Sequence, residues 1–234
     1  MTNTSLLIST QWLANHLSDP NLIIIDCRFS LADTELGNKE YQESHIPGAF
    51  HLDLNQDLSG PVQKYGGRHP LPDPYQLAQK LATIGVRYQE TLIVAYDDSR
   101  FAFASRLWWL LTYMGHDKVG LLNGGFSGWQ KEYPVTNEIP TQNNGFFQPQ
   151  IKPKMVVDIE TVKAQKDLSA VVLVDSRDSD RYLGKHEPID PIAGHIPGSV
   201  NYPWKQITDE NSKAKISEQV YRWEQVKNAK EIIV

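Results

Sequence analysis

An aspartate and an arginine two residues apart follow an apolar run at two places in the 234-residue chain. The segment Leu22-Ile-Ile-Ile-Asp-Cys-Arg28 returns as Val171-Val-Leu-Val-Asp-Ser-Arg177. β-Branched apolar runs of this length predict buried parallel strands, and ligands of open α/β sheets gather where such strands end. A carboxylate and a guanidinium at that edge could bind an anion or pair with each other. Because both segments carry the motif, we predict a structural ion pair that fixes each strand-to-loop turn.

The chain contains one cysteine, Cys27, which lies inside the first of these motifs. A thiolate at a strand end could act as a nucleophile. The second motif has Ser176 at this position, and small buried cysteines commonly serve as packing residues. We therefore predict a packing role for Cys27. A single cysteine also excludes an intramolecular disulfide and a cysteine-rich metal site.

A second string is repeated downstream of each motif, as His45-Ile-Pro-Gly-Ala49 and His195-Ile-Pro-Gly-Ser199. Two ordered matches at nearly equal offsets indicate a duplication, so the chain is predicted to hold two related domains. Since the histidine occurs in both copies, we expect it to satisfy buried backbone groups rather than to act as a catalytic base.

Strands and helices alternate in the first copy, which predicts the α/β class with a parallel sheet flanked by helices. Asp73 and Pro74 have the residue types of an N-cap and a first helical position. The next helix places Trp108, Trp109 and Tyr113 at helical spacing, which favours core contacts. After the first strand we predict a helix over 75–84, a strand over 91–96, a helix over 101–114 and a strand over 119–122.

The predicted domains are 1–135 and 156–234, joined by a linker over 136–155 that contains Pro and Asn and has little periodicity. Aligning the copies matches Thr91-Leu-Ile-Val-Ala-Tyr-Asp97 with Lys230-Glu-Ile-Ile-Val234. The second copy is therefore expected to be incomplete, without counterparts of the elements that follow Asp97. For this reason we expect poorer cooperativity after about residue 155 than before it.

The composition is that of a globular protein, with 40% hydrophobic and 22% charged residues and a formal net charge of -5. This balance offers no basic surface for a nucleic-acid partner. No apolar run reaches the roughly 18 residues of a membrane span, and residues 1–13 have no Lys or Arg before their apolar patch. We expect a cytoplasmic protein without a membrane segment, and a monomer, because two tandem domains already supply their own interface.

The ordered motifs resemble the tandem-domain rhodanese family. Besides the two repeated strings they include Gly66-Gly-Arg-His-Pro-Leu-Pro72, Ser105-Arg-Leu-Trp-Trp109 and Asn123-Gly-Gly125. The resemblance implies two rhodanese-like domains and thiosulfate or 3-mercaptopyruvate sulfurtransferase activity. In that chemistry a cysteine of the second domain accepts sulfane sulfur as a persulfide and passes it to a thiophilic acceptor. The implied partners are a small anionic sulfur donor and that acceptor, and no metal or organic cofactor is expected.

The family's cysteine opens a loop between a strand and a helix, where backbone N–H groups lower the thiol pKa. In the first copy Asp97 occupies that position, and the matching residue of the second copy is expected just beyond Val234. No catalytic nucleophile is then present in these residues, and we expect the chain as given to be inactive. The alternative is a non-catalytic rhodanese-like module that binds an anion or a protein partner. A phosphatase would need the same loop cysteine followed by an arginine, and neither is present.

The resemblance also implies candidate site residues. Arg181 matches an arginine that faces the anionic substrate, and a guanidinium fork suits a sulfonate or carboxylate. Asp57 and His69 match a segment that reaches the second domain's active site in relatives, where they could relay a proton, and Arg68 could add positive potential there. The alternatives are a surface arginine and a solvated loop. Mercaptopyruvate-type members tend to carry a second arginine where this chain has Ile189, which weakens that assignment of the donor.

Overall fold

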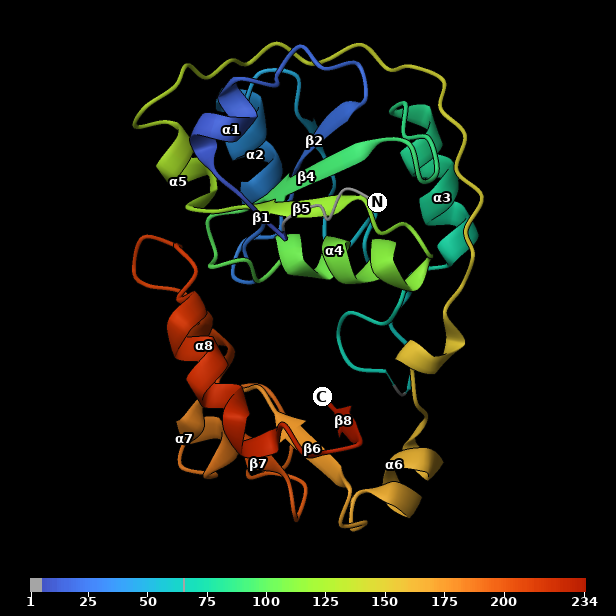
Figure 1. Cartoon of the computed structure of the whole chain (residues 1–234), viewed down its shortest axis with the longest axis vertical. Helices are drawn as coiled ribbons and strands as arrows, with labels where there is room; N and C mark the ends of the chain where they lie inside the picture. Colours follow the sequence, from blue (N-terminus) through green and yellow to red (C-terminus); the bar gives the residue numbers. More distant parts are fainter. Residues whose placement is uncertain (1–5, 65) are drawn as a thin grey trace. The chain divides into compact units, whose positions relative to one another are not determined.

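The computed structural model describes residues 6–64 and 66–234, which form two compact units. Unit 1 comprises Met1–Pro153 with Asn211–Lys213, and unit 2 comprises Lys154–Glu210 with Ala214–Val234. Figure 1 follows the chain by colour from blue through green in unit 1 to orange and red in unit 2. No helix within the described residues is long and apolar enough to cross a membrane.

Unit 1 is built on a five-stranded parallel sheet with the order β1-β5-β4-β2-β3. The strands are β1 (Leu7–Ile8), β2 (Leu22–Asp26), β3 (Phe50–His51), β4 (Leu92–Tyr96) and β5 (Val119–Leu122). β2 and β4 pair along their whole length, so Asp26 lies beside Tyr96 at the carboxyl edge. The strands predicted within these segments are confirmed.

Helices cover both faces of this sheet. They are α1 (Thr10–Ala14), α2 (Leu36–Glu43), α3 (Pro74–Thr83), α4 (Ala104–Tyr113) and α5 (Gly125–Trp129). Leu13 of α1 and Trp129 of α5 share a buried cluster with Val94 and Tyr96 of β4. α4 packs against β4 and β5, and Figure 1 shows it on the opposite side of the strands from α1 and α2.

The start of α3 follows the sequence prediction closely. The Asp73 side chain accepts the backbone N–H groups of Tyr75 and Gln76 at 2.8 and 3.1 Å, and Pro74 is the first helical residue. Gly85, just after the helix, has a φ of +94°. Capping at one end and a left-handed glycine at the other define this helix locally.

α4 begins at Ala104, three residues later than predicted. In the preceding loop Arg100 and Phe101 have φ of +58° and +68°, and residues in this left-handed region cannot belong to a right-handed helix. The core prediction for this helix is wrong: its buried side chains are Leu107, Leu110 and Leu111, whereas Trp108, Trp109 and Tyr113 are half buried.

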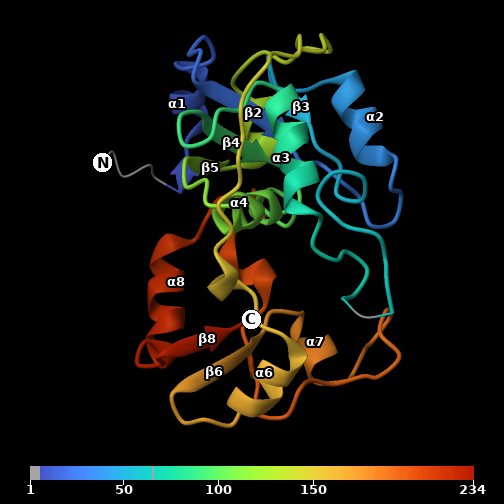
Figure 2. The same cartoon turned by 90° about the vertical axis from the view of Figure 1, so that its right-hand side faces the viewer.

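Unit 2 has a three-stranded parallel sheet with the order β7-β6-β8. Its elements are α6 (Ile159–Gln165), β6 (Val171–Asp175), α7 (Ser179–Tyr182), β7 (Val200–Asn201), α8 (Ile216–Trp223) and β8 (Glu231–Ile233), with 3-10 helices at Pro153–Met155, Trp204–Ile207 and Glu224–Val226. The buried cluster is small and consists of Val174, Tyr202 and Val226, against which Trp223 packs. Figure 2 shows β6 and β8 side by side.

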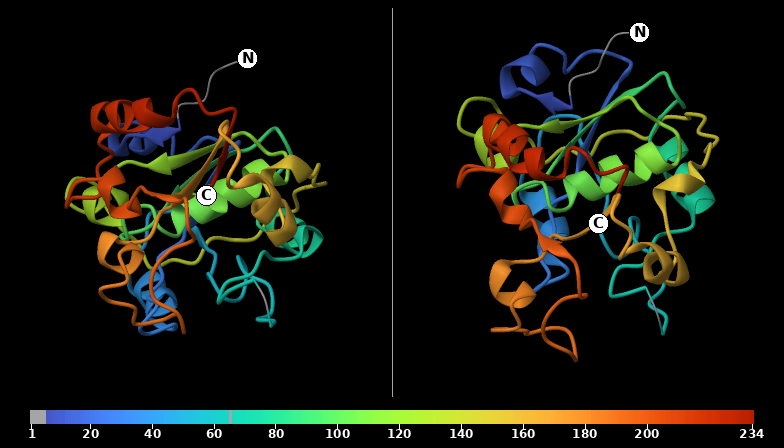
Figure 3. Two further views of the ribbon diagram at one scale, coloured as in Figure 1. Left: turned by 90° about the horizontal axis from the view of Figure 1, so that it is seen from below. Right: turned by 60° about the horizontal axis from the view of Figure 1, so that its bottom comes forward.

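The two sheets repeat one arrangement, which confirms the predicted duplication. β6 lies between β7 and β8 as β2 lies between β3 and β4, always in parallel pairs. The copies differ in the connection before the repeated histidine, because three residues separate Tyr41 from His45 whereas twelve separate Tyr182 from His195. We call these twelve residues, 183–194, the insertion loop. In Figure 3 it is the orange segment that leaves α7 and projects beyond the strands of unit 2.

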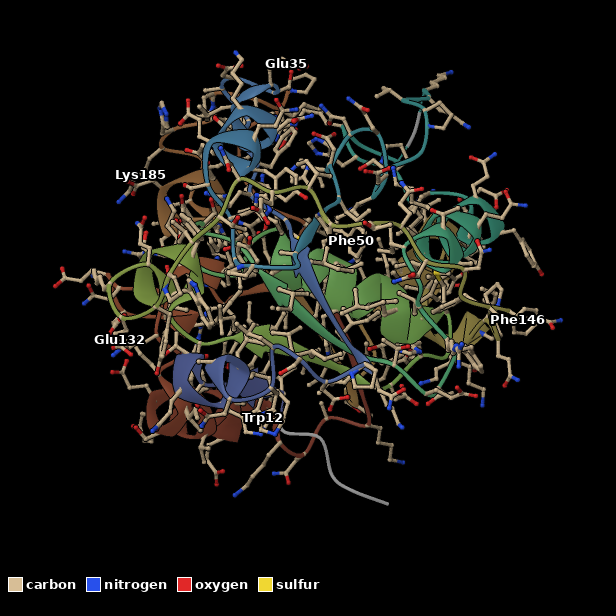
Figure 4. The ribbon with its side chains drawn as sticks, turned by 90° about the horizontal axis from the view of Figure 1, so that it is seen from above. Trp12, Glu35, Phe50, Glu132, Phe146 and Lys185 are labelled. Carbon is tan, nitrogen blue, oxygen red and sulfur yellow. The ribbon has the colours of Figure 1, made fainter. Side chains whose placement is uncertain are left out.

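The segment 136–153, which lies within the predicted linker, belongs to unit 1. Thr136 exchanges backbone hydrogen bonds with His45, and the backbone N–H of Gln150 donates to Met114 O at 2.8 Å. Phe147 is buried, whereas its neighbour Phe146 points outward, as Figure 4 shows. Backbone pairing therefore holds this irregular stretch to unit 1.

Candidate active site

Each Asp-x-Arg motif forms the predicted ion pair at the end of its strand. Arg28 Nη2 lies 2.6 Å from Asp26 Oδ2 in unit 1, and Arg177 Nη2 lies 2.7 Å from Asp175 Oδ2 in unit 2. Each arginine also donates to the carbonyl oxygen of the residue before the repeated histidine, at 2.7 and 2.5 Å. Burial opposes the charged form of Asp175, but the hydrogen bonds from Arg177 prevail and lower its pKa. The pair thus ties each strand end to the next loop.

Both repeated histidines contact a backbone carbonyl, and the predicted burial of this contact holds for His45 but not for His195, which is exposed. Nδ1 of His45 lies 2.6 Å from Tyr41 O, and Nδ1 of His195 lies 2.6 Å from Tyr182 O. Each ring also stacks on the ring of the same tyrosine. The histidines therefore satisfy carbonyls near the ends of α2 and α7.

A cavity of about 580 Å³ opens in unit 2 where β6 and β8 end. Its lining includes Asp175 and Ile233 from the strand ends, together with Arg181, Ser199 and Trp204. The Ser199 hydroxyl is buried and has no hydrogen-bond partner within the described part of the chain. A cavity that holds a guanidinium and an unpaired hydroxyl at the carboxyl edge of a parallel sheet is suited to a small anion.

Arg181, the predicted substrate-binding arginine, lines this cavity and is engaged by two carboxylates. Its Nε and Nη2 donate to Glu187 Oε2 and Oε1 at 3.1 and 2.9 Å, and Nη2 also donates to Asp190 Oδ2 at 2.8 Å. The hydrogen bonds from Arg181 lower the pKa of Glu187 to about 2, so this carboxylate stays charged at neutral pH. Arg181 is therefore a fixed cation at the cavity wall, already partly neutralised.

Both carboxylates come from the insertion loop, which has no counterpart in unit 1. Glu187 also accepts the backbone N–H groups of Ile189 and Asp190 at 3.0 Å each. Arg177 Nη1 lies 3.3 Å from Glu187 Oε2 and 3.6 Å from Asp190 Oδ2. The loop is therefore folded around two guanidinium groups. Lys185 in the same loop points away from the ribbon in Figure 4 and is exposed.

Asp57, one of the two predicted relay residues, lies in unit 1 and is mostly buried. Its Oδ1 is 2.9 Å from Lys80 Nζ, and its Oδ2 accepts the backbone N–H of Asp53 at 2.9 Å. No hydrogen bond joins Asp57 to His69 among the described residues. Each of the two side chains has partners of its own.

His69 and Arg68 lie in a loop of unit 1 that Arg106 holds in place. Arg106 donates to Leu58 O, to His69 O and to Pro70 O at 2.9 Å each, and His69 Nε2 lies 3.1 Å from Asn55 Oδ1. Burial lowers the pKa of His69, and the charges of Arg106 and Arg68 lower it further. The imidazole is therefore neutral at physiological pH, while Arg68 is exposed.

Cys27 is buried between its two motif neighbours, as predicted. Burial raises the pKa of its thiol, and the nearby charges of Asp26, Asp97 and Asp57 raise it further. A protonated thiol without solvent access is a packing group rather than a nucleophile.

The family model described as the rhodanese-like domain matches residues 9–132 and 158–234, which make up most of the chain. The chain belongs to the rhodanese family. A Pseudomonas aeruginosa protein named "Probable 3-mercaptopyruvate sulfurtransferase" is 47% identical over 196 residues, covering 82% of this chain and 69% of that protein. Relatives of this rhodanese are thus sulfurtransferases.

Two further relatives are named after different sulfur donors, one after 3-mercaptopyruvate and the other after thiosulfate. The 3-mercaptopyruvate sulfurtransferase of Escherichia coli K12 is 32% identical over 89% of this chain and 74% of its own length. The thiosulfate sulfurtransferase of Rattus norvegicus is 32% identical over 92% of this chain and 74% of its own length. The crystal structure of SseA, a 3-mercaptopyruvate sulfotransferase from Escherichia coli, has a TM-score of 0.82 at 29% identity and covers 96% of this chain and 84% of that chain.

Asp97 follows β4 directly, at the position where the sequence resemblance leads us to expect the family's cysteine. Its carboxylate accepts the backbone N–H groups of Ser99, Phe101, Phe103 and Ala104 at 2.8 to 3.0 Å. Burial raises the pKa of Asp97, and these four hydrogen bonds oppose that shift. The loop after β4 therefore encloses a negative charge with backbone donors.

Several residues of the candidate site were not singled out by the sequence. Glu187 and Asp190 lie in an irregular loop whose contacts have no periodic signature, and Arg106 acts through carbonyls distant in the chain. Ser199 could have been noticed, because the repeated string ends in Ala49 in one copy and in a serine in the other. Among the described residues no group of three or more His, Cys, Asp or Glu could hold a metal ion.

Proposed function

We propose that the unit 2 cavity binds the small anionic sulfur donor of a rhodanese sulfurtransferase reaction, of the thiosulfate or 3-mercaptopyruvate type. One observation carries the proposal: Arg181 and the unpaired hydroxyl of Ser199 both line a cavity at the carboxyl ends of β6 and β8. A guanidinium and a hydroxyl in one cavity can serve the sulfonate or carboxylate end of such a donor.

The nucleophile of this reaction is proposed to follow β8 as Asp97 follows β4, at a position after Val234. A thiolate there attacks the sulfane sulfur of thiosulfate, the sulfur–sulfur bond of the donor breaks, and sulfite leaves with the electron pair. A thiophilic acceptor then removes the outer sulfur of the persulfide and restores the thiolate. Backbone donors like those around Asp97 would stabilise both the thiolate and the charged persulfide.

We also propose roles for the three candidate residues of unit 1. His69 is neutral at physiological pH, because burial and the nearby arginines lower its pKa, so it is in the form that accepts a proton. Asp57 is proposed to share this relay, and Arg68 to add positive potential for the donor. The enzyme is further proposed to be a monomer of the cytoplasm.

The test is a sulfurtransferase assay on residues 1–234 and on the product of the natural coding sequence. Thiosulfate with cyanide and 3-mercaptopyruvate with a thiol serve as substrate pairs, and the persulfide is located by mass spectrometry. A persulfide on a cysteine after β8, with turnover only in the protein that contains it, supports the proposal. A persulfide on Cys27 would overturn the assignment of that residue to packing.

A non-catalytic rhodanese-like module remains the second candidate, favoured by the carboxylate that replaces the cysteine in unit 1. The same assay separates the two candidates. If the protein made from the natural coding sequence shows no turnover but still binds an anion at Arg181, the binding module is favoured.

A further inference from the structure

The insertion loop of unit 2 adds carboxylates to a frame that unit 1 builds without them. Among the described residues Arg28 of unit 1 forms an ion pair with Asp26 only, whereas in unit 2 Arg177 approaches Asp175, Glu187 and Asp190. The two added carboxylates also pair with Arg181, which lines the cavity, although neither of them lines the cavity itself. The loop therefore partly neutralises the cation that this cavity presents.

The five N–H donors of Arg181 are divided unequally. Glu187 takes one from Nε and one from Nη2, which is the side-on edge of the guanidinium. Asp190 takes the second donor of Nη2 at 2.8 Å. Within the described part of the chain, the two donors of Nη1 have no hydrogen-bond partner. An anion that binds end-on needs one donor from Nη1 and one from Nη2. Asp190 already occupies the Nη2 donor, so the anion has to displace it.

The two carboxylates differ in how firmly they are held. The Glu187 side chain is 4% exposed and also accepts two backbone N–H groups, so it is part of the loop's own fold. The Asp190 side chain is 51% exposed, and its other contact in the structure is Arg177 Nη1 at 3.6 Å. Asp190 is thus able to leave Arg181 while staying beside Arg177.

We propose that Asp190 limits the affinity of the donor site by competing with the donor's anionic group for Arg181, while Glu187 orients the guanidinium. This inference rests on the proposed role of Arg181 in donor binding. With Asp190 in place, the guanidinium groups of Arg177 and Arg181 are paired with three carboxylates, so no positive charge is left over to attract an anion. An anion enters only when its interaction with Nη1 and Nη2 exceeds that of the displaced carboxylate.

The experiment is a titration of the 234-residue chain with thiosulfate at constant ionic strength, followed by the NMR signal of the Arg181 side-chain Nε–Hε group. The variants are Asp190→Asn, which removes the competing charge, and Arg181→Met, which removes the binding group. Asp180→Asn is the matched control, because Asp180 lies in α7 next to Arg181 and is exposed. It removes the same charge, and no hydrogen bond or ion pair of its side chain is seen in the described part of the chain.

Because an exchangeable ion pair contributes about 1 kcal/mol, Asp190→Asn is expected to tighten the thiosulfate Kd about fivefold. Asp180→Asn should leave the Kd within a factor of two, about the change expected from net charge alone, and Arg181→Met should abolish saturable binding. The Asp190→Asn change should also shift the free-state Nε–Hε signal of Arg181, which a purely structural residue elsewhere would not do.

Two results would overturn the proposal, and they are distinguishable. If Arg181→Met abolishes binding but Asp190→Asn behaves like Asp180→Asn, Asp190 does not compete and the donor site stands. If Arg181→Met leaves thiosulfate binding unchanged, the proposed donor site is itself wrong and the competition falls with it. Asp190 is half exposed, so its asparagine variant is expected to fold, and its amide spectrum checks this directly.

Discussion

The Asp97 carboxylate accepts the backbone N–H of Ala104, the first residue of α4, at 2.8 Å. Three further N–H groups of the same loop donate to this buried side chain. Asp97 thus occupies a loop after β4 whose backbone donors surround a carboxylate.

Replacing Asp97 by alanine should destabilise unit 1 strongly. The change leaves four buried donors without a partner, and we expect a loss of roughly 3–5 kcal/mol in the free energy of unfolding. Asp97→Asn keeps one acceptor oxygen and should lose less. Urea unfolding of both variants measures this, with Asp167→Asn as an exposed control. A loss below about 1 kcal/mol for the alanine variant would show that water satisfies these donors.

The two Asp-x-Arg pairs form a matched test of burial. Arg28 is nearly inaccessible and also lies over the ring of Phe126 at 4.0 Å, whereas the Arg177 side chain is 28% exposed. Arg28→Met leaves the charge of Asp26 buried and should cost roughly 3–5 kcal/mol of unfolding free energy. Arg177→Met should cost about 1–2 kcal/mol, since the Arg177 side chain is itself partly exposed and Glu187 keeps Arg181 as a second partner. Urea unfolding curves compare the two, and equal losses would contradict the burial argument.

Features determined by neighbouring residues were predictable from the sequence. The Asp73 cap of α3, the glycine after it and the apolar strands depend on local chemistry, and all are found. The duplication could be recognised because both copies use the same residues for the same contacts, namely the Asp-x-Arg ion pair and the histidine contact.

Features determined by long-range contacts were not predictable. α4 starts late because Asp97 draws the following N–H groups into a loop, and a periodicity count cannot see this competition. Arg181 was found through the family pattern, but its partners come from a loop without periodicity. Trp109 stacks on Tyr113 in a half-buried position, although their spacing equals that of core residues.

His116 should make unit 1 less stable in acid. It is buried beside Phe147, its Nδ1 accepts the backbone N–H of Gln89, and its Nε2 has no hydrogen-bond partner in the described part of the chain. Burial lowers its pKa from 6.5 to about 4. Between these pH values the unfolded chain binds the proton more readily, so stability is full above about pH 6.5 and falls as the pH drops towards 4.

The size of this effect is on the order of 3 kcal/mol, given by the distance between the two pKa values. His116→Gln keeps a side-chain acceptor but cannot be protonated, so its unfolding free energy should depend much less on pH in this window. Urea unfolding at pH 7 and pH 4.5 measures both proteins. An unchanged pH dependence in the variant would assign the acid sensitivity to other groups.

Hydrogen exchange should be faster in β8 than in its counterpart β4. β4 lies between β2 and β5, whereas β8 pairs with β6 on one side and has no strand partner on the other among the described residues. The buried cluster of unit 2 is also smaller than the cluster of unit 1 that holds Tyr96 of β4. Edge strands over small cores open by local fluctuations of low free energy. Hydrogen exchange followed by mass spectrometry compares the deuterium uptake of peptides that span 92–96 and 231–233. The strands β2 and β6 serve as controls, because each lies between two other strands. Equal protection of β4 and β8 would mean that unit 2 opens only together with unit 1, and would overturn the expectation that the two units differ in cooperativity.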